Sequence, residues 1–420
     1  MIGVIADDFT GATDVAVAFR RAGLRSMVVF SAGAATELPD NDVTVVALKT
    51  RTVAAAEAVG QSLHALEWLR QRGATQIFFK YCSTFDSRPQ GNIGPVADAL
   101  ADALDAPRVV FVPASPEHLR TQYMGHLFVD GVLLSDSPMK DHPLTPMTQS
   151  HLPTVLGQQT SRDIGLIELA DVRRGPRRIV ERLNGTQRRS TPYVLVDALD
   201  GADLLDIGAA CLDEILVTGA AGLAGGLGAA YSRRLTADST PTLAELALAA
   251  DGPGAVLAGS CSARTLQQID YMKTAGHPWL QLNAAQSQDA KGLAHDALAW
   301  YDGHEPASGP LIYSSVPPTD LQRSREQLGS ESVSELFESA MGLIAQGLTD
   351  RGVTRLVVAG GETSGAVVTA LGITGGIIGE EEAVGVPWIH ATDRRLSLLL
   401  KSGNFGDRQL LSRAVAAVTR

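Results

Sequence analysis

Two adjacent carboxylates, Asp7 and Asp8, follow the apolar segment 1–6 and precede a Thr-Gly pair at positions 10 and 11. Neighbouring carboxylates repel each other, so they usually need a cation, a hydroxyl or a proton between them. One carboxylate at the end of a strand can instead cap the helix that follows. The pair is therefore either a helix cap with an exposed neighbour or part of a polar site.

Charged and hydroxyl-bearing side chains also follow two further predicted strands. Segment 43–48 runs into Lys49-Thr50-Arg51, and segment 76–81 runs into a loop that carries the Lys80, Ser83 and Thr84 side chains. If these strands are neighbours, their carboxyl ends form one crevice. Arginine offers a fork to a carboxylate, and aspartate accepts from a hydroxyl or takes its proton during attack on a phosphoryl group. This inventory suits a small hydroxylated acid, although each residue alone is compatible with ordinary surface or turn chemistry.

Three glycine-containing turns follow strands in the second half of the chain: Gly259-Ser260-Cys261-Ser262, Gly360-Gly361-Glu362-Thr363-Ser364-Gly365 and Lys401-Ser402-Gly403-Asn404-Phe405-Gly406. Glycine lets the backbone approach a phosphate, and free N–H groups at a helix N-terminus attract the anion. We therefore predict a nucleotide held at several points. Glu362 would repel a phosphate unless it faces Mg²⁺ or caps the helix. Neither a P-loop nor a dinucleotide fingerprint is present.

The elements that carry these residues alternate between apolar strands and amphipathic helices. Strands are predicted at 2–6, 26–30, 43–48, 76–81, 108–112, 193–196, 215–217, 255–258, 310–313, 355–359 and 396–401, and helices at 13–21, 54–72 and 93–104. Repeated strand–helix units with continuous apolar strands predict an α/β fold with mostly parallel sheets. We expect a domain at 1–235 with an irregular arm at about 113–190, a connector at 236–254 and a second domain at 255–420, with both sites facing an interdomain cleft.

Composition excludes several classes of protein. The chain has 420 residues and a formal net charge of -11, which argues against broad binding to nucleic acid or anionic membranes. Three scattered cysteines do not make a disulfide framework or a zinc site, so a reducing cytoplasm is expected. The first residues lack the basic region of a signal peptide. The uncharged run 215–232 is marginal in length for a membrane span and poor in large apolar residues.

The motifs together resemble the four-carbon acid sugar kinases over the full length of the chain. The resemblance rests on Asp-Asp-Phe-Thr-Gly-Ala-Thr-Asp at 7–14, on the segment 80–94 that ends in Gly-Asn-Ile-Gly, and on the three glycine turns. It implies a sugar-acid-binding N-terminal domain, an ATP-binding C-terminal domain and transfer of a phosphoryl group from ATP, with Mg²⁺, to a terminal hydroxyl. Residues that match the substrate motif are Asp8, also the expected catalytic group, Arg51, Lys80, Tyr81, Cys82, Ser83 and Thr84. Residues that match the ATP motif are Ser260, Gly360, Gly361, Glu362, Thr363 and Gly403.

The loop after Lys80 differs from the version found in threonate and erythronate kinases, which resembles Lys-x-Asp-Ser-Thr-x-Arg-Gly-Asn. Here the aspartate stands at position 86, after the Ser-Thr pair instead of before it. This order, with His142-Pro143-Leu144-Thr145-Pro146-Met147, resembles the branch of the family that acts on 3-oxo-tetronates. The resemblance therefore implies 4-phosphorylation of a 3-oxo-tetronate, with D-threonate or D-erythronate as the alternative substrate.

Two hypotheses that place the chain in other classes of protein stay open. The same crevice could belong to a non-catalytic sugar-acid-binding protein, or to an NAD-linked hydroxy-acid dehydrogenase, although the dinucleotide fingerprint is absent. The expected partners are a small sugar acid and ATP, with no nucleic acid and no membrane. A homo-oligomer is left open, and the identity of the general base is open between Asp8 and nearby groups. No metal ligands are assigned.

Overall fold

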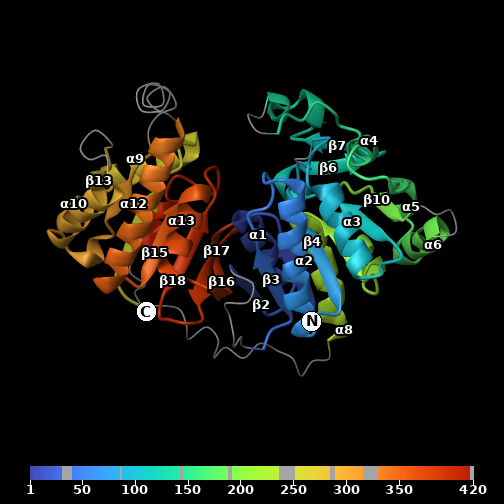
Figure 1. Cartoon of the computed structure of the whole chain (residues 1–420), viewed down its shortest axis with the longest axis horizontal. Coiled ribbons are helices and arrows are strands. Elements are labelled where there is room, and N and C mark those ends of the chain that lie inside the picture. The colour runs from blue at the N-terminus through green and yellow to red at the C-terminus, as the bar shows by residue number, and fades with distance from the viewer. Residues whose placement is uncertain are drawn as a thin grey trace. The chain divides into compact units, whose positions relative to one another are not determined.

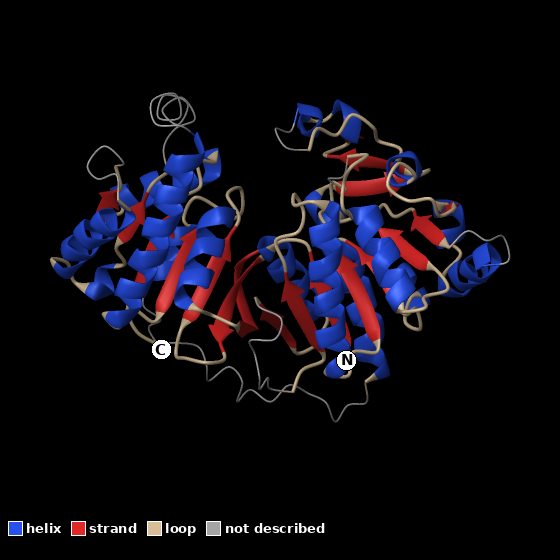
Figure 2. Cartoon of the chain, viewed as in Figure 1, coloured by secondary structure: helices blue, strands red, loops and turns tan. Residues whose placement is uncertain are grey.

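The computed structural model describes residues 1–30, 40–85, 88–141, 145–187, 192–235, 251–283, 289–315 and 330–416 (Figure 1). The chain divides into two compact units, Met1–Pro241 and Thr242–Arg420. Most of the expected connector, residues 236–250, lies outside the described residues. Strands and helices alternate along both units, as Figure 2 shows.

The first unit contains a parallel sheet. Its strands, in spatial order, are β2 (Ser26–Val29), β3 (Val43–Ala47), β1 (Ile2–Ala6), β4 (Gln76–Lys80), β11 (Leu216–Gly219), β5 (Val109–Val112), β10 (Tyr193–Val196) and β9 (Ile164–Ile167). Nearly all residues of these strands apart from β9 are buried, because helices cover both faces of the sheet. This explains why the strands read as continuous apolar runs in the sequence.

Helices pack on the two faces of this sheet in separate layers. Phe78 of β4 contacts Phe19 of α1 (Phe9–Arg21), with ring centroids 6.0 Å apart, while Ile77 and Phe79 belong to a core with α2 (Ala55–Gln71) and α3 (Ile93–Ala103). Successive side chains of a strand point to opposite faces, so α1 and the α2–α3 pair lie on opposite sides. Helices α7 (Gly201–Ala210) and α8 (Ala221–Arg234) join α1 in its layer.

The predicted irregular arm is partly regular, which corrects the sequence analysis. It holds an antiparallel sheet of β6 (Arg120–Tyr123), β7 (His126–Val129) and β8 (Val132–Leu133). Segments η1 (Pro116–His118), η2 (Leu134–Asp136), η3 (Pro138–Asp141) and α4 (Leu152–Leu156) surround it. Beyond Gly157 the chain returns to the main sheet as β9, followed by α5 (Leu169–Val172) and α6 (Pro176–Gln187). Strands of two to four residues are too short to show a clear periodicity, so these elements were missed.

The second unit contains a mixed sheet. Its parallel strands are β13 (Trp279–Gln281), β14 (Leu311–Tyr313), β12 (Gly254–Ala258), β15 (Arg355–Ala359) and β18 (Ser397–Lys401). The antiparallel strands β17 (Val386–Ala391) and β16 (Gly375–Ala383) follow β18. Helices α9 (Ala263–Thr274) and α14 (Leu410–Val415) share one core with the sheet. Helices α10 (Ala290–Asp302), α12 (Ser330–Asp350) and α13 (Gly361–Leu371) pack against one another, and η6 (Pro306–Ser308) precedes β14.

None of the described helices has both the length and the apolar content needed to cross a lipid bilayer. The uncharged run 215–232 forms strand β11 and most of helix α8.

Candidate active site

The three strands that end in charged residues are neighbours in the first sheet. Strand β1 lies between β3 and β4, and Ala6 pairs with both Ala47 and Lys80. The residues that follow these positions therefore emerge at one edge of the sheet. The three strand ends therefore meet the condition for a common crevice. They lie where successive strands switch from one side of β1 to the other, which is the usual ligand position in open α/β folds.

Arg51 binds the carboxylate pair. Its Nε and Nη2 atoms donate to the two carboxylate oxygens of Asp7 at 2.9 and 2.8 Å, and Nη2 also forms an ion pair with Asp8 Oδ1 at 2.9 Å. The sequence analysis expected this fork to face a substrate carboxylate, whereas the structure shows that Asp7 occupies it. Two carboxylates can stand side by side here because one guanidinium bridges them.

Asp8 is also the N-cap of α1. Its backbone is extended, Oδ1 accepts from the N–H of Gly11 at 2.8 Å, and Oδ2 accepts from the hydroxyl of Thr10 at 2.9 Å. Asp8 is thus both a helix cap and part of a polar cluster, because the same carboxylate binds the N–H of Gly11 and the guanidinium of Arg51. Four lone pairs serve three partners, and the side chain is 28% exposed, so Asp8 can accept one more hydrogen bond from a ligand.

Gly11 is required by this arrangement. A Cβ atom on residue 11 would lie 2.2 Å from Asp8 Oδ1 and 3.1 Å from the Nζ atom of Lys80. The missing side chain therefore lets a carboxylate and an ammonium flank the first turn of α1, which explains the Thr-Gly pair that follows the two aspartates.

The two carboxyl groups differ in pKa. Burial raises the pKa of Asp7, and Arg51 opposes this rise without cancelling it. Burial acts in the same sense on Asp8, but Arg51, Lys80 and the hydrogen bonds from Thr10 and Gly11 outweigh it, so the pKa of Asp8 is lowered. Asp8 therefore remains ionised at neutral pH and can accept a hydrogen bond from a hydroxyl.

The segment after β4 contributes to the site unequally. Lys80 is buried beside Gly11, and its Nζ donates to the carbonyl of Tyr81 at 2.9 Å. The Tyr81 side chain points into the core, where its hydroxyl lies 3.0 Å from that of Thr218. It cannot contact a ligand from there, so only the backbone of this residue can serve the site. Cys82 and Ser83 are partly exposed, and Thr84 is buried with its hydroxyl 3.4 Å from the Cys82 sulfur.

Asn92 positions the Arg51 loop, a role that the sequence analysis missed. Its Nδ2 donates to the carbonyls of Thr50 and Val53 at 2.7 and 2.9 Å. Asn92 stands at the start of α3 but makes no side-chain cap there. The asparagine of the Gly-Asn-Ile-Gly motif was visible in the sequence, but its position before a predicted helix indicated nothing more than a helix cap. Asp86, the residue on which the substrate branch depends, and His142 to Leu144 lie outside the described residues.

The three glycine turns of the second unit also converge. They follow β12, β15 and β18, which are adjacent and parallel, with Ala359 of β15 paired to Ala258 and to Lys401. Backbone hydrogen bonds join the turns: the N–H of Ser260 donates to Ala359, and that of Gly360 donates to Lys401, at 3.1 and 2.9 Å. Four of the six predicted ATP-binding residues, Ser260, Gly360, Thr363 and Gly403, therefore lie together at the carboxyl edge of this sheet.

Close packing explains two of these glycines. A Cβ atom on Gly403 would lie 2.5 Å from the hydroxyl of Ser260, and Gly360 has φ +130°, a conformation that other residues rarely adopt. A Cβ on Gly361 would meet nothing within 4 Å, so the first turn of α13 faces open space. The N–H groups of that turn have no partner within the helix, and an anion can bind them. Glu362, in the same turn, is exposed.

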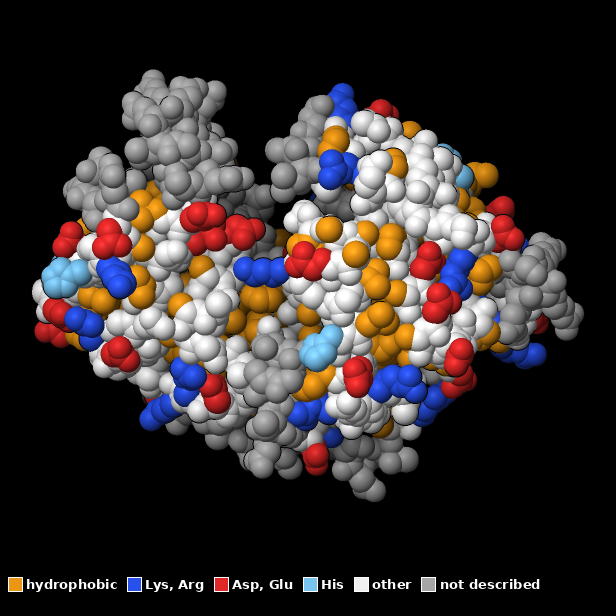
Figure 3. Space-filling model, viewed as in Figure 1, with side chains coloured by type: hydrophobic (Ala, Val, Ile, Leu, Met, Phe, Trp, Pro, Cys, Tyr) orange, Lys and Arg blue, Asp and Glu red, His pale blue; other side chains and the backbone are white. Residues whose placement is uncertain are grey.

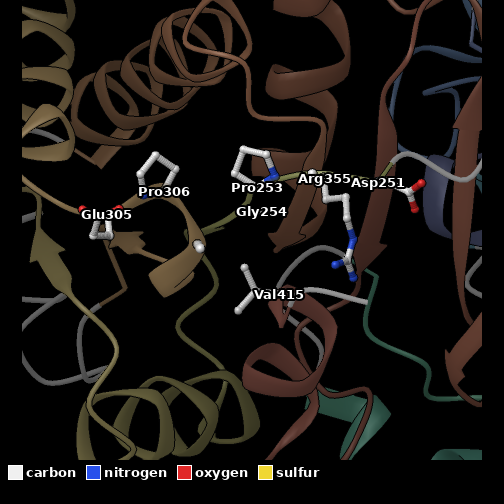
Figure 4. Close-up of a pocket in the computed structure, with 9 residues that line it drawn as sticks. Asp251, Pro253, Gly254, Glu305, Pro306, Arg355 and Val415 are labelled. Carbon is white, nitrogen blue, oxygen red and sulfur yellow. The ribbon is translucent and has the colours of Figure 1, made fainter. Parts of the chain in front are cut away.

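A cavity of about 390 Å³ lies at the opposite edge of the same sheet. Figure 4 shows it between Pro253 and Gly254 at the start of β12, Pro306, Val415 and the side chain of Arg355. The Arg355 guanidinium donates to the carbonyls of Ala414 and Ala416, so it is engaged in closing the end of α14. This cavity therefore is separate from the glycine turns, at the amino ends of the strands.

The described residues contain no group of three or more His, Cys, Asp or Glu side chains that could hold a metal ion. None of the three cysteines, all of which lie in the described part of the chain, forms a disulfide. Burial raises the pKa of the Cys211 thiol, so this group is not activated.

Fold and site define a two-domain α/β protein with a carboxylate–guanidinium–lysine cluster in one unit and three converging glycine turns in the other. A sugar-binding N-terminal domain matches residues 2–227, and a nucleotide-binding C-terminal domain matches residues 255–411. The chain is 43% identical to a 3-oxo-tetronate kinase of Cupriavidus necator and 44% identical to one of Pseudomonas fluorescens, in each case over 99% of this chain and 96% of the relative. A solved structure of a Salmonella typhimurium LT2 protein, proposed there to be a tRNA synthase, is 38% identical over 98% of both chains with a TM-score of 0.90.

The chain belongs to the four-carbon acid sugar kinases, as its motifs had indicated.

Proposed function

We propose that this protein transfers the γ-phosphoryl group of ATP to the 4-hydroxyl of a 3-oxo-tetronate. The observation that carries the proposal is the gathering of Asp8, Arg51 and Lys80 at the ends of three adjacent strands. This group offers an ionised acceptor for a hydroxyl beside two cationic donors for an acid. Full-length relatives that bear the name 3-oxo-tetronate kinase support it.

In this mechanism Asp8 orients the 4-hydroxyl through the free lone pair of its carboxylate. The bond from this hydroxyl oxygen to the γ-phosphorus forms while the bond from phosphorus to the bridging oxygen of ADP breaks. The hydroxyl proton passes to Asp8, and ADP leaves. A carboxylate of lowered pKa is a weak base, but a loose transition state needs the proton to move only late, so orientation is its larger task.

Lys80 and the remaining N–H groups of Arg51 would bind the oxygens of the sugar acid. A 3-oxo group only accepts hydrogen bonds, so its pocket must present donors, and the segment Lys80–Thr84 carries an ammonium, two hydroxyls and backbone N–H groups. A threonate site would instead need an acceptor at this place. In this chain the aspartate of the loop follows the Ser-Thr pair, at position 86, and this order therefore favours the 3-oxo acid.

The first turn of α13 can accommodate a phosphate, because a Cβ on Gly361 would meet nothing within 4 Å and the N–H groups of this turn have no partner within the helix. We infer that Ser260, Gly360–Thr363 and Gly403 bind ATP. Mg²⁺ in such sites is held largely by phosphate oxygens and water, so it does not need a cluster of protein ligands. When bound, it neutralises charge on the phosphates.

The competing functions separate in one assay. ADP release is coupled to a reporter and measured with 3-oxo-tetronate, D-threonate and D-erythronate, each with and without Mg²⁺. The kinase proposal predicts ADP release that needs both Mg²⁺ and the 3-oxo acid. A binding protein would retain the acid without releasing ADP, and a dehydrogenase would respond to NAD instead.

A nucleic-acid substrate, which the name of the Salmonella protein suggests for that protein, is not favoured for this chain. The net charge is -11, and both acidic and basic side chains are present on the face seen in Figure 3. The three cysteines form no disulfide in the described structure, which favours a reducing compartment, so we propose a cytoplasmic location.

A further inference from the structure

Lys401, the last residue of β18, is a lysine with no exposed surface. Its Nζ donates to the carbonyl of Gly403 at 2.8 Å and to the hydroxyl of Thr265 at 2.9 Å. The same carbonyl accepts from the Ser262 and Thr265 hydroxyls at 2.6 and 2.9 Å. The ammonium thus ties the Gly403 turn to the first turn of α9, which Ser262 caps.

Lys401 also contacts the second glycine turn through its backbone. Its carbonyl accepts from the N–H of Gly360, the residue that begins the turn before α13. Gly360 in turn approaches Ser260, whose backbone nitrogen would lie 3.1 Å from a Cβ at position 360. One residue therefore joins all three turns that we assign to ATP.

The charge of this lysine has no counter-ion among the residues that the structure describes. Its Nζ donates to a neutral hydroxyl and a neutral carbonyl, and Arg264 of α9 adds a like charge. Arg355 of β15 and His390 of β17 pair with Ser397, at the opposite end of β18, and Glu362 of α13 is exposed, whereas Lys401 is buried. A buried ammonium without an anion is costly, so such a group either loses its proton or gains an anionic partner.

We propose that Lys401 is a positioning residue of the nucleotide site, a buried cation that holds the Gly360 and Gly403 turns and whose charge is completed by the phosphates of the bound nucleotide. This inference rests on the proposed function, because it takes the glycine turns as the ATP site. It adds a residue that the motif alone did not single out and a proton that binds together with the nucleotide.

The direction of the proton movement follows from burial. Burial lowers the pKa of Lys401 to about 7, with Arg264 acting in the same sense. Phosphates nearby would raise this pKa, so the protein must take up a proton when the nucleotide binds above pH 7. At pH 8 a group of pKa about 7 is largely deprotonated, so binding should be accompanied by net uptake of protons.

The first test uses the unmodified protein. Titration calorimetry of ADP with Mg²⁺ at pH 8, in buffers of different ionisation enthalpy, gives the number of protons bound with the nucleotide. The proposal predicts net proton uptake and a dissociation constant that rises with pH above 7, until the pKa of the complex is reached. Binding without proton uptake would overturn it.

The second test uses Lys401→Met, and the matched control is Lys291→Met, which changes an exposed lysine of helix α10. Removal of the cation should weaken ADP binding by roughly tenfold or more and abolish proton uptake. The melting temperature without nucleotide should stay level or rise, because Gly403 keeps two hydroxyl donors and a buried charge is lost. The control should bind ADP and protons as the unmodified protein does.

The outcomes separate this inference from the proposed function. If the unmodified protein binds no ADP, the nucleotide site itself is misassigned. If it binds ADP and phosphorylates the acid while Lys401→Met binds ADP equally well, only the role of Lys401 is wrong. If Lys401→Met loses melting temperature together with affinity, the lysine is merely a structural residue, and the proposal also fails.

Discussion

The substitution Asp8→Asn separates the two roles of this carboxylate. Asparagine is about as good an N-cap as aspartate, so the bond to the N–H of Gly11 can persist in the variant. The negative charge and one of the two hydrogen-bond acceptors are lost. The helix should therefore remain capped while the group that orients the substrate hydroxyl is disabled.

The expected magnitudes follow from the contacts. The lost ion pair with Arg51 involves side chains that are 25% and 28% exposed, and Arg51 keeps both bonds to Asp7, so the free energy of unfolding should change by about 1 kcal/mol or less. That corresponds to a shift in melting temperature of about 2–4 °C or less. Loss of a general base or orienting group lowers kcat by roughly 10²-fold or more, which is about 2.7 kcal/mol in the barrier.

The assay is ADP release at saturating ATP and 3-oxo-tetronate, with thermal unfolding followed on the same preparations. Asp200→Asn is the matched control, because Asp200 is also the N-cap of a helix, α7, and its side chain is 54% exposed. Asp200 does not belong to the segments that follow β1, β3 and β4. The control should keep its kcat. Near-normal kcat in Asp8→Asn would refute the reasoning and leave Asp8 as a helix cap alone.

Further predictions concern both units. Gly361→Val should fold, because a side chain there meets open space, yet it should weaken ATP binding without affecting the sugar acid; titration calorimetry with both ligands checks this, and equal loss of both would indicate misfolding. Gly360→Ala should lower the free energy of unfolding by about 1–3 kcal/mol in denaturant titrations, since φ is +130°; an unchanged midpoint would contradict the strain. Arg51→Lys should lower both stability and affinity for the acid, because a lysine cannot form the fork to Asp7, and unchanged values would exclude that role. Without nucleotide, the unmodified protein should gain stability relative to Lys401→Met between pH 7 and about pH 10, because the unfolded lysine binds more protons over that range; a constant difference would contradict the lowered pKa.

Much of the fold could be predicted because the parallel strands are buried on both faces. Strands β1, β10 and β15 agree with the predicted bounds, since each is an apolar run between turn residues. The antiparallel strands β16 and β17 were missed. Residues 375–383 are rich in glycine and glutamate, so no apolar pattern marks them as a strand. Helix α1 begins at Phe9, four residues before its predicted start, because the Thr-Gly pair reads as a turn until the cap from Asp8 is known.

The candidate site was predictable as a set of strand ends but not as a set of contacts. Sequence spacing brings Asp8, Arg51 and Lys80 to one edge once β1 is known to lie between β3 and β4. It cannot tell that Asp7 occupies the fork of Arg51, or that the Tyr81 side chain turns into the core, because both depend on rotamers set by packing. Lys401 looked like one more polar residue of a turn, and only its complete burial distinguishes it.

The central claim is tested most directly by competition for a limiting amount of ATP. Equal concentrations of 3-oxo-tetronate and D-threonate are mixed with the protein and Mg²⁺, and the two phosphorylated acids are separated by mass spectrometry. Their ratio gives the ratio of the two kcat/KM values. The account predicts 3-oxo-tetronate 4-phosphate in excess by about 10⁴-fold, since a site that presents only donors to a carbonyl leaves the O–H donor of the threonate hydroxyl without an acceptor. Comparable amounts of the two products would contradict the substrate assignment, and no phosphorylated acid at all would contradict the proposed reaction.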